Sequence, residues 1–579
     1  KSGEQFPLYF HRPRAEIISM SGNPRDVLID CGGKLCFEFT TETQYQPINL
    51  YGITIAGGHS NKGGGAIRVT VHSETAWKIQ HCIFANHTSE KLGGALYFGV
   101  KSQISMDYST FTNNRAVQGG GAMYADSVDV SMNTVTFEEN EATHGDGGAI
   151  QITSNDAGSV VYLVSLSTKN NKASEGGGFM FMRGGKATFE GATRAVGDTA
   201  LGSTGGGFTV VRAAVVIITG AEFYATQAVK GSGGAIVCYG SNMDITNSLF
   251  DSTQSLEGTG GAIVTRLCDI KISNSSFLNN VAVGSNSVGQ SWGGAISLTS
   301  RTTGLVRNSS FVNNNVMSIL WSGEQRVGGA GAAIACDGCA SLSVLSSIFS
   351  QNRAGRGGAL FLYNVNSPTN VKISNSIFTA NRATTGGGGA IFWNEYHPIM
   401  DEATWSMHSG NQALYRNFIG SGPATISLSH WKSPAELSQV EGGMVVRVSD
   451  THAVTTTDDT LYVTNTEAFE PAINLLDHST ATDNGQPVVD HDASERYVVY
   501  ASCRNSTLFG ESEALVTVNG TAKYIGLGLS ARPGRYVLEL IASGAGVASQ
   551  FVNVQVADCP AGRYLRASGA SFTCTDCNP

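Results

Sequence analysis

Apolar and polar residues alternate in short stretches that recur along the first two thirds of the chain. Counting back from a set of recurring phenylalanines, the residues seven and five places earlier are apolar. The seventh-place set is Trp77, Ile104, Val130, Met243, Ile270, Leu342 and Val371, and the fifth-place set is Ile79, Met106, Met132, Ile245, Ile272, Val344 and Ile373. The residues between them are mostly polar, as at Lys78, Ser131 and Asp244. A period of two with one apolar face predicts β-strands and not helices.

A Gly-Gly-Ala-apolar tetrad, or a close variant, divides the chain into units of nearly constant length. The tetrads end at Ile67, Leu96, Met123, Ile150, Met180, Thr209, Ile236, Ile263, Ile296, Ile334, Leu360 and Ile391. Most spacings are 26 to 31 residues, with two longer ones of 33 and 38. Self-similarity at a fixed period indicates a repeat architecture. The glycine pair is expected at a corner that needs a positive φ or a close backbone approach.

A second marker lies between the tetrads and consists of Phe, two variable residues and Asn. We expect these asparagines to be turn residues: Asn114, Asn140, Asn280, Asn314, Asn352 and Asn381. A unit of this length with short strands and no amphipathic helix has the size of one β-helix coil. Stacked coils bury what a single coil cannot, so the pattern predicts an all-β, right-handed parallel β-helix.

The residue three places before each phenylalanine has the same parity as the buried Ile and Met. We therefore expect it to point inward and to form a partial internal ladder, since buried polar groups must be hydrogen-bonded. The asparagines of this expected ladder are Asn247, Asn274, Asn308 and Asn375. Asn274 and Asn308 also begin glycosylation sequons, and burial would make them poor acceptors. Asn86, Asn505 and Asn519 are the expected N-glycosylation sites.

Charge and cysteine content narrow the class of partner and the compartment. The net charge of −9, from 37 basic and 46 acidic residues, argues against nucleic acid as a partner. No apolar stretch approaches the roughly 20 residues of a membrane-spanning helix. Eleven cysteines and five sequons fit an oxidising secretory route, and we expect an extracellular or cell-surface location.

The Gly-Gly-Ala-Ile and Phe-x-x-Asn repeats resemble those of the chlamydial polymorphic outer-membrane proteins, and similar repeats occur in β-helical surface proteins of protists and algae. The resemblance covers roughly residues 25–415. It implies a β-helix of the pectate-lyase type in a cell-surface protein. The segments 27–33 and 48–55 look like the first coils of such a helix.

The end of the Gly-Gly-Ala rhythm sets the expected domain boundaries. We expect the β-helix at 1–415, terminal coils, a cap and a linker at 416–485, and an Ig-like β-sandwich at 486–557, where short strands and turns alternate. The segment 558–579 is similar to the ephrin-receptor-like cysteine-rich repeat of extracellular proteins. By that resemblance Cys559 pairs with Cys574, and Cys577 opens a further, truncated repeat.

Three other cysteine pairings are expected from the sequence: Cys31–Cys36, Cys238–Cys268 and Cys336–Cys339. The partners of Cys82, Cys503 and Cys577 stay open. Cys336-Asp337-Gly338-Cys339 also has the form of a redox motif, but no helix follows it, so a structural bridge is favoured. His144 with Asp146, and His81 with Cys82, are weak metal-ligand patterns because further ligands are missing at usable spacing. We expect no metal and no cofactor.

The β-helix also hosts polysaccharide lyases and hydrolases, so catalysis must be weighed. Glycoside hydrolysis needs two carboxylates roughly 5 to 9.5 Å apart on one groove. The outward positions six places before the phenylalanines read Lys78, Ser105, Ser131, Asp244, Lys271 and Lys372, which offers no such pair. We therefore expect a non-enzymatic structural or adhesive protein of a coat, fibre or appendage, such as a ciliary or flagellar hair. Its expected partners are further copies of itself or other surface and matrix proteins. A polysaccharide lyase or hydrolase and a glycan-binding module remain the alternatives.

Overall fold

The structure is a computed structural model, in which the chain divides into two compact units. The first comprises Lys1–Thr384 and Tyr396–Gln412, and the second comprises Thr385–Glu395 and Ala413–Pro579. The structure describes the chain apart from residues 1–4, 11–15, 40–47, 71–74, 100–101, 155–158, 203–204, 212–214, 285–290, 320–324, 366, 368–369, 395, 422–424, 431–459, 464–471, 477–497, 505, 517–520, 525–526, 543–548, 557, 559–562, 569–570 and 577–579.

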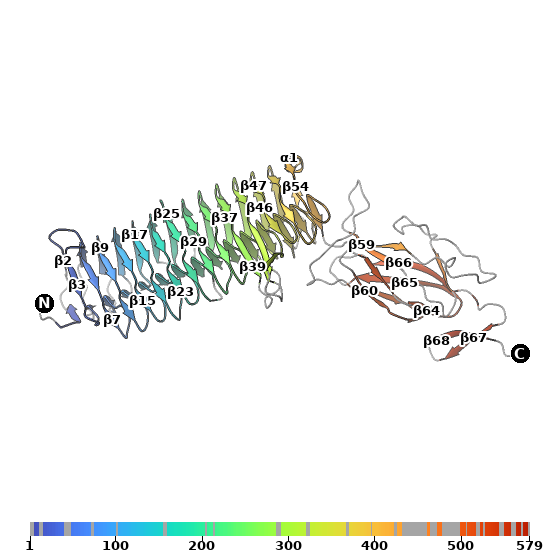
Figure 1. Cartoon of the computed structure of the whole chain (residues 1–579), viewed down its shortest axis with the longest axis horizontal. Helices are drawn as coiled ribbons and strands as arrows, with labels where there is room; N and C mark the ends of the chain where they lie inside the picture. The colour runs from blue at the N-terminus through green and yellow to red at the C-terminus, as the bar shows by residue number, and fades with distance from the viewer. Residues whose placement is uncertain are drawn as a thin grey trace. The chain divides into compact units, whose positions relative to one another are not determined.

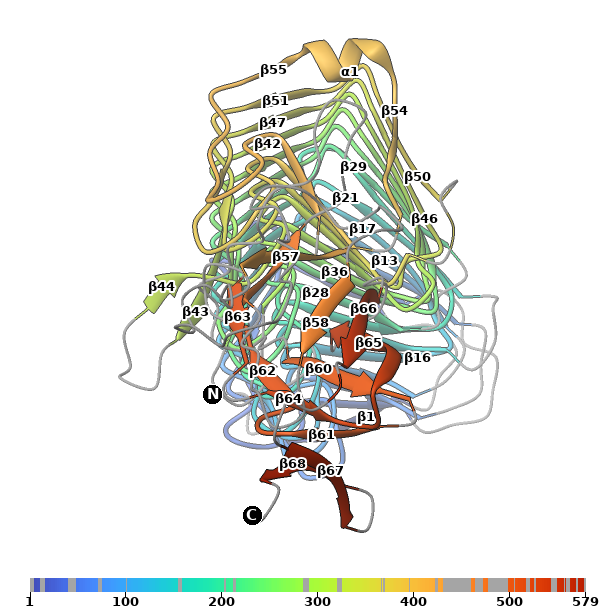
Figure 2. The same ribbon diagram turned by 90° about the vertical axis from the view of Figure 1, so that its right-hand side faces the viewer.

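The first unit is a right-handed parallel β-helix, which confirms the predicted fold class (Figure 1). One turn contains four short strands, exemplified by β8 (Ile67–Val69), β9 (Thr75–Gln80), β10 (Ile83–Ala85) and β11 (Thr88–Ser89). Each strand pairs in parallel with its counterpart in the next turn, as β10 does with β14 (Thr110–Thr112). Viewed close to the stacking direction, the coils superpose, with β46 and β50 on the side opposite β47 and β51 (Figure 2).

Four sheets, here called A to D, run along the stack. In the first unit sheet A consists of β1 (Leu8–Phe10), β4 (Phe37–Phe39), β8, β12 (Leu96–Phe98), β16 (Met123–Asp126), β20 (Ile150–Thr153), β24 (Met180–Arg183), β28 (Phe208–Val211), β32 (Ile236–Tyr239), β36 (Ile263–Arg266), β40 (Ile296–Thr299), β45 (Ile334–Asp337) and β49 (Leu360–Tyr363). Sheet B consists of β2 (Glu16–Ile18), β5 (Ile48–Tyr51), β9, β13 (Ser102–Asp107), β17 (Asp129–Asn133), β21 (Val160–Val164), β25 (Lys186–Glu190), β29 (Val215–Thr219), β33 (Asn242–Thr246), β37 (Asp269–Ser273), β41 (Thr303–Arg307), β46 (Ser341–Leu345), β50 (Val371–Ser374) and β54 (Ile399–Met400).

Sheets C and D complete each turn. Sheet C consists of β3 (Leu28–Asp30), β6 (Thr54–Ala56), β10, β14, β18 (Thr136–Glu138), β22 (Ser167–Lys169), β26 (Arg194–Val196), β30 (Glu222–Tyr224), β34 (Leu249–Asp251), β38 (Ser276–Leu278), β42 (Ser310–Val312), β47 (Ile348–Ser350), β51 (Ile377–Thr379) and β55 (His408–Ser409). Sheet D consists of β7 (His59–Ser60), β11, β15 (Arg115–Ala116), β19 (Glu141–Ala142), β23 (Lys172–Ala173), β27 (Thr199–Ala200), β31 (Gln227–Ala228), β35 (Gln254–Ser255), β39 (Val281–Gly284), β43 (Asn315–Ile319), β48 (Arg353–Ala354) and β52 (Arg382–Ala383), with β44 (Gln325–Val327) antiparallel to β43.

The strand pairing corrects one position of the repeat. Met180 pairs with Phe208, and Phe208 pairs with Ile236. Thr209, which the tetrad pattern places in this column, is one residue further along. Three consecutive glycines at 205–207 allow two alignments of the tetrad, and only the stacking of the side chains selects between them.

The two glycines of a tetrad have different roles, as the pair before β40 shows. Gly293 has φ +68°, a conformation that side-chain-bearing residues rarely adopt. Gly294 has no positive φ, but a Cβ on it would lie 2.5 Å from backbone oxygens of Ala332 and Asn315. The corner therefore needs both properties that the sequence suggests, one at each glycine.

One short helix, α1 (Glu402–Ser406), lies in the last coil of the first unit and is visible at the edge of the coil in Figure 2. Asp401 caps it by accepting a hydrogen bond from Thr404 N at 2.9 Å. The Thr404 side chain is buried, so the helix contributes a polar side chain to the interior of the stack.

The second unit contains β53 (Ile391–Trp393) paired with β56 (Ile419–Ser421) and a small set of mostly antiparallel sheets. The largest sheet has the order β58 (Thr460–Val463), β66 (Gln550–Val556), β65 (Gly534–Ala542), β60 (Val498–Cys503) and β62 (Glu513–Leu515). Two further sheets consist of β57 (Thr425–His430), β59 (Ala472–Leu476) and β63 (Thr521–Lys523), and of β61 (Thr507–Phe509) and β64 (Gly528–Ser530).

A common core joins these sheets into a small sandwich: Val499, Leu538 and Val552 are buried together with Tyr524 and Leu529. The sandwich begins earlier than the expected boundary at 486, because β57, β58 and β59 belong to its sheets. Alternation alone does not distinguish a strand of a terminal coil from a strand of a sandwich, which explains the error. Beyond it, β67 (Arg563–Ser568) and β68 (Ser571–Asp576) form a hairpin.

Candidate functional site

The asparagines of the Phe-x-x-Asn marker form an internal ladder, so the expectation that they are turn residues is wrong. Each accepts hydrogen bonds from the rung before it: Asn314 donates to Asn352 Oδ1 from its backbone N at 3.1 Å and from Nδ2 at 2.9 Å. Asn314 Nδ2 also donates to Phe277 O at 3.0 Å. The members are buried and comprise Asn114, Asn140, Asn171, Asn280, Asn314, Asn352, Asn381 and Asn411.

The turn is made instead by the residue before each ladder asparagine. Asn113, Asn279 and Asn313 have φ of +53°, +55° and +54°. A residue in this left-handed region reverses the chain sharply, so the following side chain enters the interior. Placed there, an amide can satisfy both its own polar atoms and the backbone of the neighbouring rung.

The ladder expected at Asn247, Asn274, Asn308 and Asn375 is also wrong. These residues are exposed at the corner between sheets B and C, with φ of +50°, +50°, +48° and +49°. The left-handed residue interrupts the alternation of the strand, so parity counted across it fails. The next residue points inward and forms a hydroxyl ladder, in which Ser275 N donates to Ser309 Oγ at 3.2 Å and Ser309 N to Ser347 Oγ at 3.3 Å.

The phenylalanines that precede the asparagine ladder stack face to face. Ring centroids from Phe223 through Phe378 are separated by 4.7 to 5.0 Å, with interplanar angles of 6° or less. The stretch around Phe189 and Phe223 is the most degenerate part of the repeat in the sequence, and the structure places Phe223 in this stack. Phe189 belongs to sheet B, where it pairs with Leu163 and Ile218.

Two titratable groups occupy rungs of the asparagine ladder. Asp198 accepts from Asn171 Nδ2 at 2.8 Å and from Thr168 Oγ1 at 2.6 Å, and burial raises its pKa to about 7. On the next rung the buried Thr226 hydroxyl has no partner among the described residues. At the first rung, burial lowers the pKa of His87 to about 4, and its ring contacts Gly58 N and Ile55 O.

Sequence reasoning missed both groups. Asp198 follows Asn171 by 27 residues, the length of one coil, so the register of the repeat contained the signal. It was overlooked because the phenylalanine that marks the position is absent from this coil, where Ala195 pairs with Phe223.

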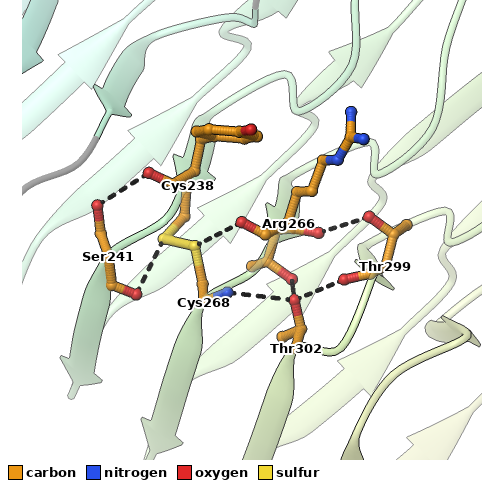
Figure 3. Close-up of a disulfide and its surroundings, with 8 residues drawn as sticks. Cys238, Ser241, Arg266, Cys268, Thr299 and Thr302 are labelled. Carbon is orange, nitrogen blue, oxygen red and sulfur yellow. Dashed lines mark hydrogen bonds between the residues drawn. A yellow bond between two sulfur atoms is a disulfide. The ribbon is translucent and has the colours of Figure 1, made fainter.

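Disulfides join Cys31 to Cys36, Cys238 to Cys268 and Cys336 to Cys339, which are the three pairings expected from the sequence. The second connects neighbouring coils: Cys238 lies in β32 and Cys268 directly precedes β37 (Figure 3). Thr302 Oγ1 accepts from Cys268 N at 3.5 Å and donates to Thr299 O at 2.7 Å, which links the bridge to the following coil. Cys82 and Cys503 are free, whereas Cys559 and Cys577 lie outside the described residues.

The sequons differ in what the structure shows of them. Asn86 is exposed with φ +57°. Asn274 and Asn308 are exposed as well, so the burial argument against glycans there is withdrawn. Asn505 and Asn519 lie outside the described residues.

The weak metal and redox patterns do not form sites. His81 is exposed and stacks on Tyr108 at 5.0 Å, whereas the neighbouring Cys82 points into the core. Both sulfurs of the Cys336–Cys339 motif are buried in their disulfide. In the part of the chain that the structure describes, there is no group of three potential metal ligands. The same described residues contain no helix that is long and apolar enough to span a membrane.

The outward face of sheet B is where a β-helix would carry paired carboxylates. At one outward position, successive rungs from β9 to β37 present Lys78, Ser105, Ser131, Tyr162, Thr188, Ile217, Asp244 and Lys271. Acidic residues do not adjoin one another in this column. Asp244 and Asp269 lie on neighbouring strands two residues out of register, and Lys271 is the direct partner of Asp244.

Comparison with known proteins identifies no family. No family model matches the sequence, and no curated protein matches it. A double mutant of the tailspike protein of E. coli bacteriophage HK620 aligns with a TM-score of 0.21 at 10% identity, covering 91% of this chain and 85% of that chain. A single mutant of that tailspike in complex with a pentasaccharide aligns with a TM-score of 0.19 at 11% identity, covering 90% and 81%. Scores this low carry no functional conclusion.

Proposed function

We propose that this chain is a non-enzymatic structural or adhesive protein of the cell exterior, a rigid β-helical building block of a coat, a fibre or an appendage such as a ciliary or flagellar hair. Its working partners would be further copies of itself or other surface and matrix proteins. The Gly-Gly-Ala-Ile and Phe-x-x-Asn repeats, which resemble those of the chlamydial polymorphic outer-membrane proteins, point to the same setting.

The observation that carries the proposal is the continuity of the side-chain ladders. Stacked phenylalanines and hydrogen-bonded asparagines extend over consecutive rungs, and each asparagine accepts from the backbone N of the rung before. Such a stack resists bending because every rung is fixed to both neighbours. Rigidity along one direction is what a spacer or a fibre subunit requires.

The absence of catalysis is part of the proposal. Its support is the outward column of sheet B from Lys78 to Lys271, in which Asp244 is the one acidic residue. An inverting hydrolase places two carboxyl groups roughly 6.5 to 9.5 Å apart across a substrate groove. The Asp244 and Asp269 pair is the arrangement to test, by replacing both with Asn and assaying pectin, alginate and related polymers. Measurable turnover that the double substitution abolishes would refute the non-enzymatic role.

An extracellular, glycosylated setting is proposed from the three disulfides and the exposed sequon at Asn86. The similarity of the C-terminal segment to the ephrin-receptor-like cysteine-rich repeat adds a Cys559–Cys574 pairing to this proposal. Peptide mapping of the unreduced, secreted protein tests both points together. Free thiols at Cys559 and Cys574 would contradict the module.

Immunogold electron microscopy of the native cell surface tests the structural role itself. We expect label at regular intervals along a coat or fibre, and rods joined to one another in extracts. Label confined to the interior of cells, or only to dispersed single molecules in the medium, would contradict the proposal.

A further inference from the structure

A shallow trough crosses the outer face of sheet B near the N-terminal end of the stack. Its volume is about 380 Å³, and its lining comes from β9, β13, β17 and β21. Along one outward column the register is Lys78, Ser105, Ser131 and Tyr162. Two small serines between a lysine and a tyrosine leave a depression three rungs long, roughly 14 Å at about 4.8 Å per rung.

The polar groups of the trough are available to a ligand. Lys78, Gln103 and Ser131 are exposed and Ser105 is half-buried, and none of the four has an intramolecular partner among the described residues. Asp129 is the exception, because its Oδ1 accepts from Val160 N at 2.8 Å. That bond fixes the carboxylate in place at the edge of the trough.

Tyr162 forms a preorganised wall at one end. The residue is 39% exposed, and its hydroxyl donates to Glu190 Oε2 at 2.6 Å. A ring held by its hydroxyl loses little conformational freedom when a ligand packs against it. Val160, which is 46% exposed, extends the apolar part of this wall.

We propose that this trough binds a short, uncharged oligosaccharide. The hydroxyl groups of a sugar chain match the mixed donors and acceptors of Gln103, Ser105 and Ser131, and the C–H face of a pyranose ring packs on the Tyr162 ring. Lys78 and Asp129 contribute opposite charges that balance, so the lining offers no excess charge to attract a polyuronate or a sulfated glycan. This binding is independent of the structural role, since it is measured on the isolated chain.

The test uses the purified full chain titrated with cellotriose, maltotriose, mannotriose and N-acetylchitotriose, with saturation-transfer NMR and calorimetry as readouts. We expect at least one of these to bind with a Kd on the order of 1 mM, typical of a few hydrogen bonds and one ring contact. Tyr162→Ala should weaken that binding at least about tenfold, which corresponds to 1.4 kcal/mol. Ser131→Arg should abolish it by filling the floor.

Matched variants separate loss of binding from loss of folding. Tyr224→Ala removes a tyrosine of similar exposure, 45%, from the outer face of sheet C and should leave the affinity unchanged. Circular dichroism and thermal unfolding should be the same for all three variants. The proposal is overturned if no trisaccharide binds at 10 mM, if binding survives both Tyr162→Ala and Ser131→Arg, or if only charged glycans bind.

Discussion

Replacing Asp198 with Asn should stabilise the β-helix at neutral pH and alter how its stability depends on pH. Asp198 occupies an asparagine rung, and burial raises its pKa from 3.8 to about 7. Because the pKa of Asp198 is higher in the folded chain than in the unfolded chain, the favourable contribution of this group to stability is fully present below about pH 4 and is lost as pH rises through 7. At 1.36 kcal/mol per pH unit, the loss between these limits is roughly 4 kcal/mol.

The asparagine would also repair the ladder locally. By analogy with the other rungs, its Nδ2 would donate to the backbone oxygen of Thr168 and to the Thr226 hydroxyl, which has no partner among the described residues. Thr168 Oγ1 now donates to Asp198 Oδ2 at 2.6 Å and would lose its acceptor. This exchange of hydrogen bonds does not depend on pH, and its effect on stability is smaller than the effect of ionising Asp198.

The contribution of His87 to stability depends on pH in the opposite sense to that of Asp198. A pH profile of the parent chain alone therefore does not isolate the effect of Asp198. Its pKa is lowered from 6.5 to about 4, so its contribution is present above pH 6.5 and is lost as pH falls through 4. The informative quantity is the difference between Asp198→Asn and the parent chain at each pH, because the His87 contribution cancels in it.

The assay is guanidinium unfolding at pH 4 and pH 8, with unfolding rates used where refolding is incomplete. We expect Asp198→Asn to raise the free energy of unfolding relative to the parent chain. This gain should be larger at pH 8 than at pH 4 by roughly 4 kcal/mol. Asp269→Asn, at an exposed carboxylate of β37, is the control and should show almost no difference. Equal effects at the two pH values would refute the assignment of Asp198 as a buried carboxyl.

Three further changes test other parts of the fold. Reducing the Cys238–Cys268 bridge, which closes a 30-residue separation, should lower the free energy of unfolding by roughly 3 to 4 kcal/mol. The free energy is measured with and without reductant in the parent chain, and a Cys238→Ala/Cys268→Ala variant is the control. Gly294→Ala should cost more than about 1 kcal/mol although its φ is not positive, because the new Cβ meets backbone; a change within about 0.5 kcal/mol in thermal unfolding would contradict the close approach. Asn352→Ala should cost more than about 3 kcal/mol of stability, because it leaves buried donors unpaired. Asn308→Ala should cost no more than about 1 kcal/mol. The reverse order in denaturant unfolding would support the ladder that the sequence predicted at Asn308.

The parallel β-helix was predictable because two independent periods agree in the sequence. Alternation around residues such as Ile104 and Met106 defines strands, and the tetrad spacing defines the length of a coil. Stacking then follows, since no single coil buries its own apolar side chains. The Cys238–Cys268 bridge was predictable for the same reason, because a separation of 30 residues places the two cysteines on neighbouring rungs.

The polar ladders were assigned to the wrong residues because parity does not survive a left-handed turn. Asn274 has φ +50° and Asn279 has φ +55°, so the chain between β37 and the ladder changes direction twice. Each such residue shifts the inward face by one position, and Ser275 and Asn280 enter the interior in place of their neighbours. Asparagine is common at both kinds of position, as turn former and as ladder member, so residue type did not resolve them.

The trough escaped prediction for a different reason. Its floor depends on which residues of four successive strands share one outward column, and Tyr162 enters that column only through the register of β21 with β17. Counting back six places from a phenylalanine does not reach Tyr162, because Thr168 occupies the phenylalanine column in this coil. The residues of an outward column follow no hydrophobic pattern, so the sequence does not predict which of them lie next to one another.

Cryo-electron microscopy of the protein in its native surface assembly tests the central claim most directly. The account predicts rods with parallel rungs spaced about 4.8 Å apart, an unbroken phenylalanine stack from Phe223 to Phe378, and repeated incorporation of these rods into a coat or fibre. Antiparallel pairing between successive coils of residues 67–383, or intact β-helices found only as isolated molecules with no place in any surface structure, would contradict it.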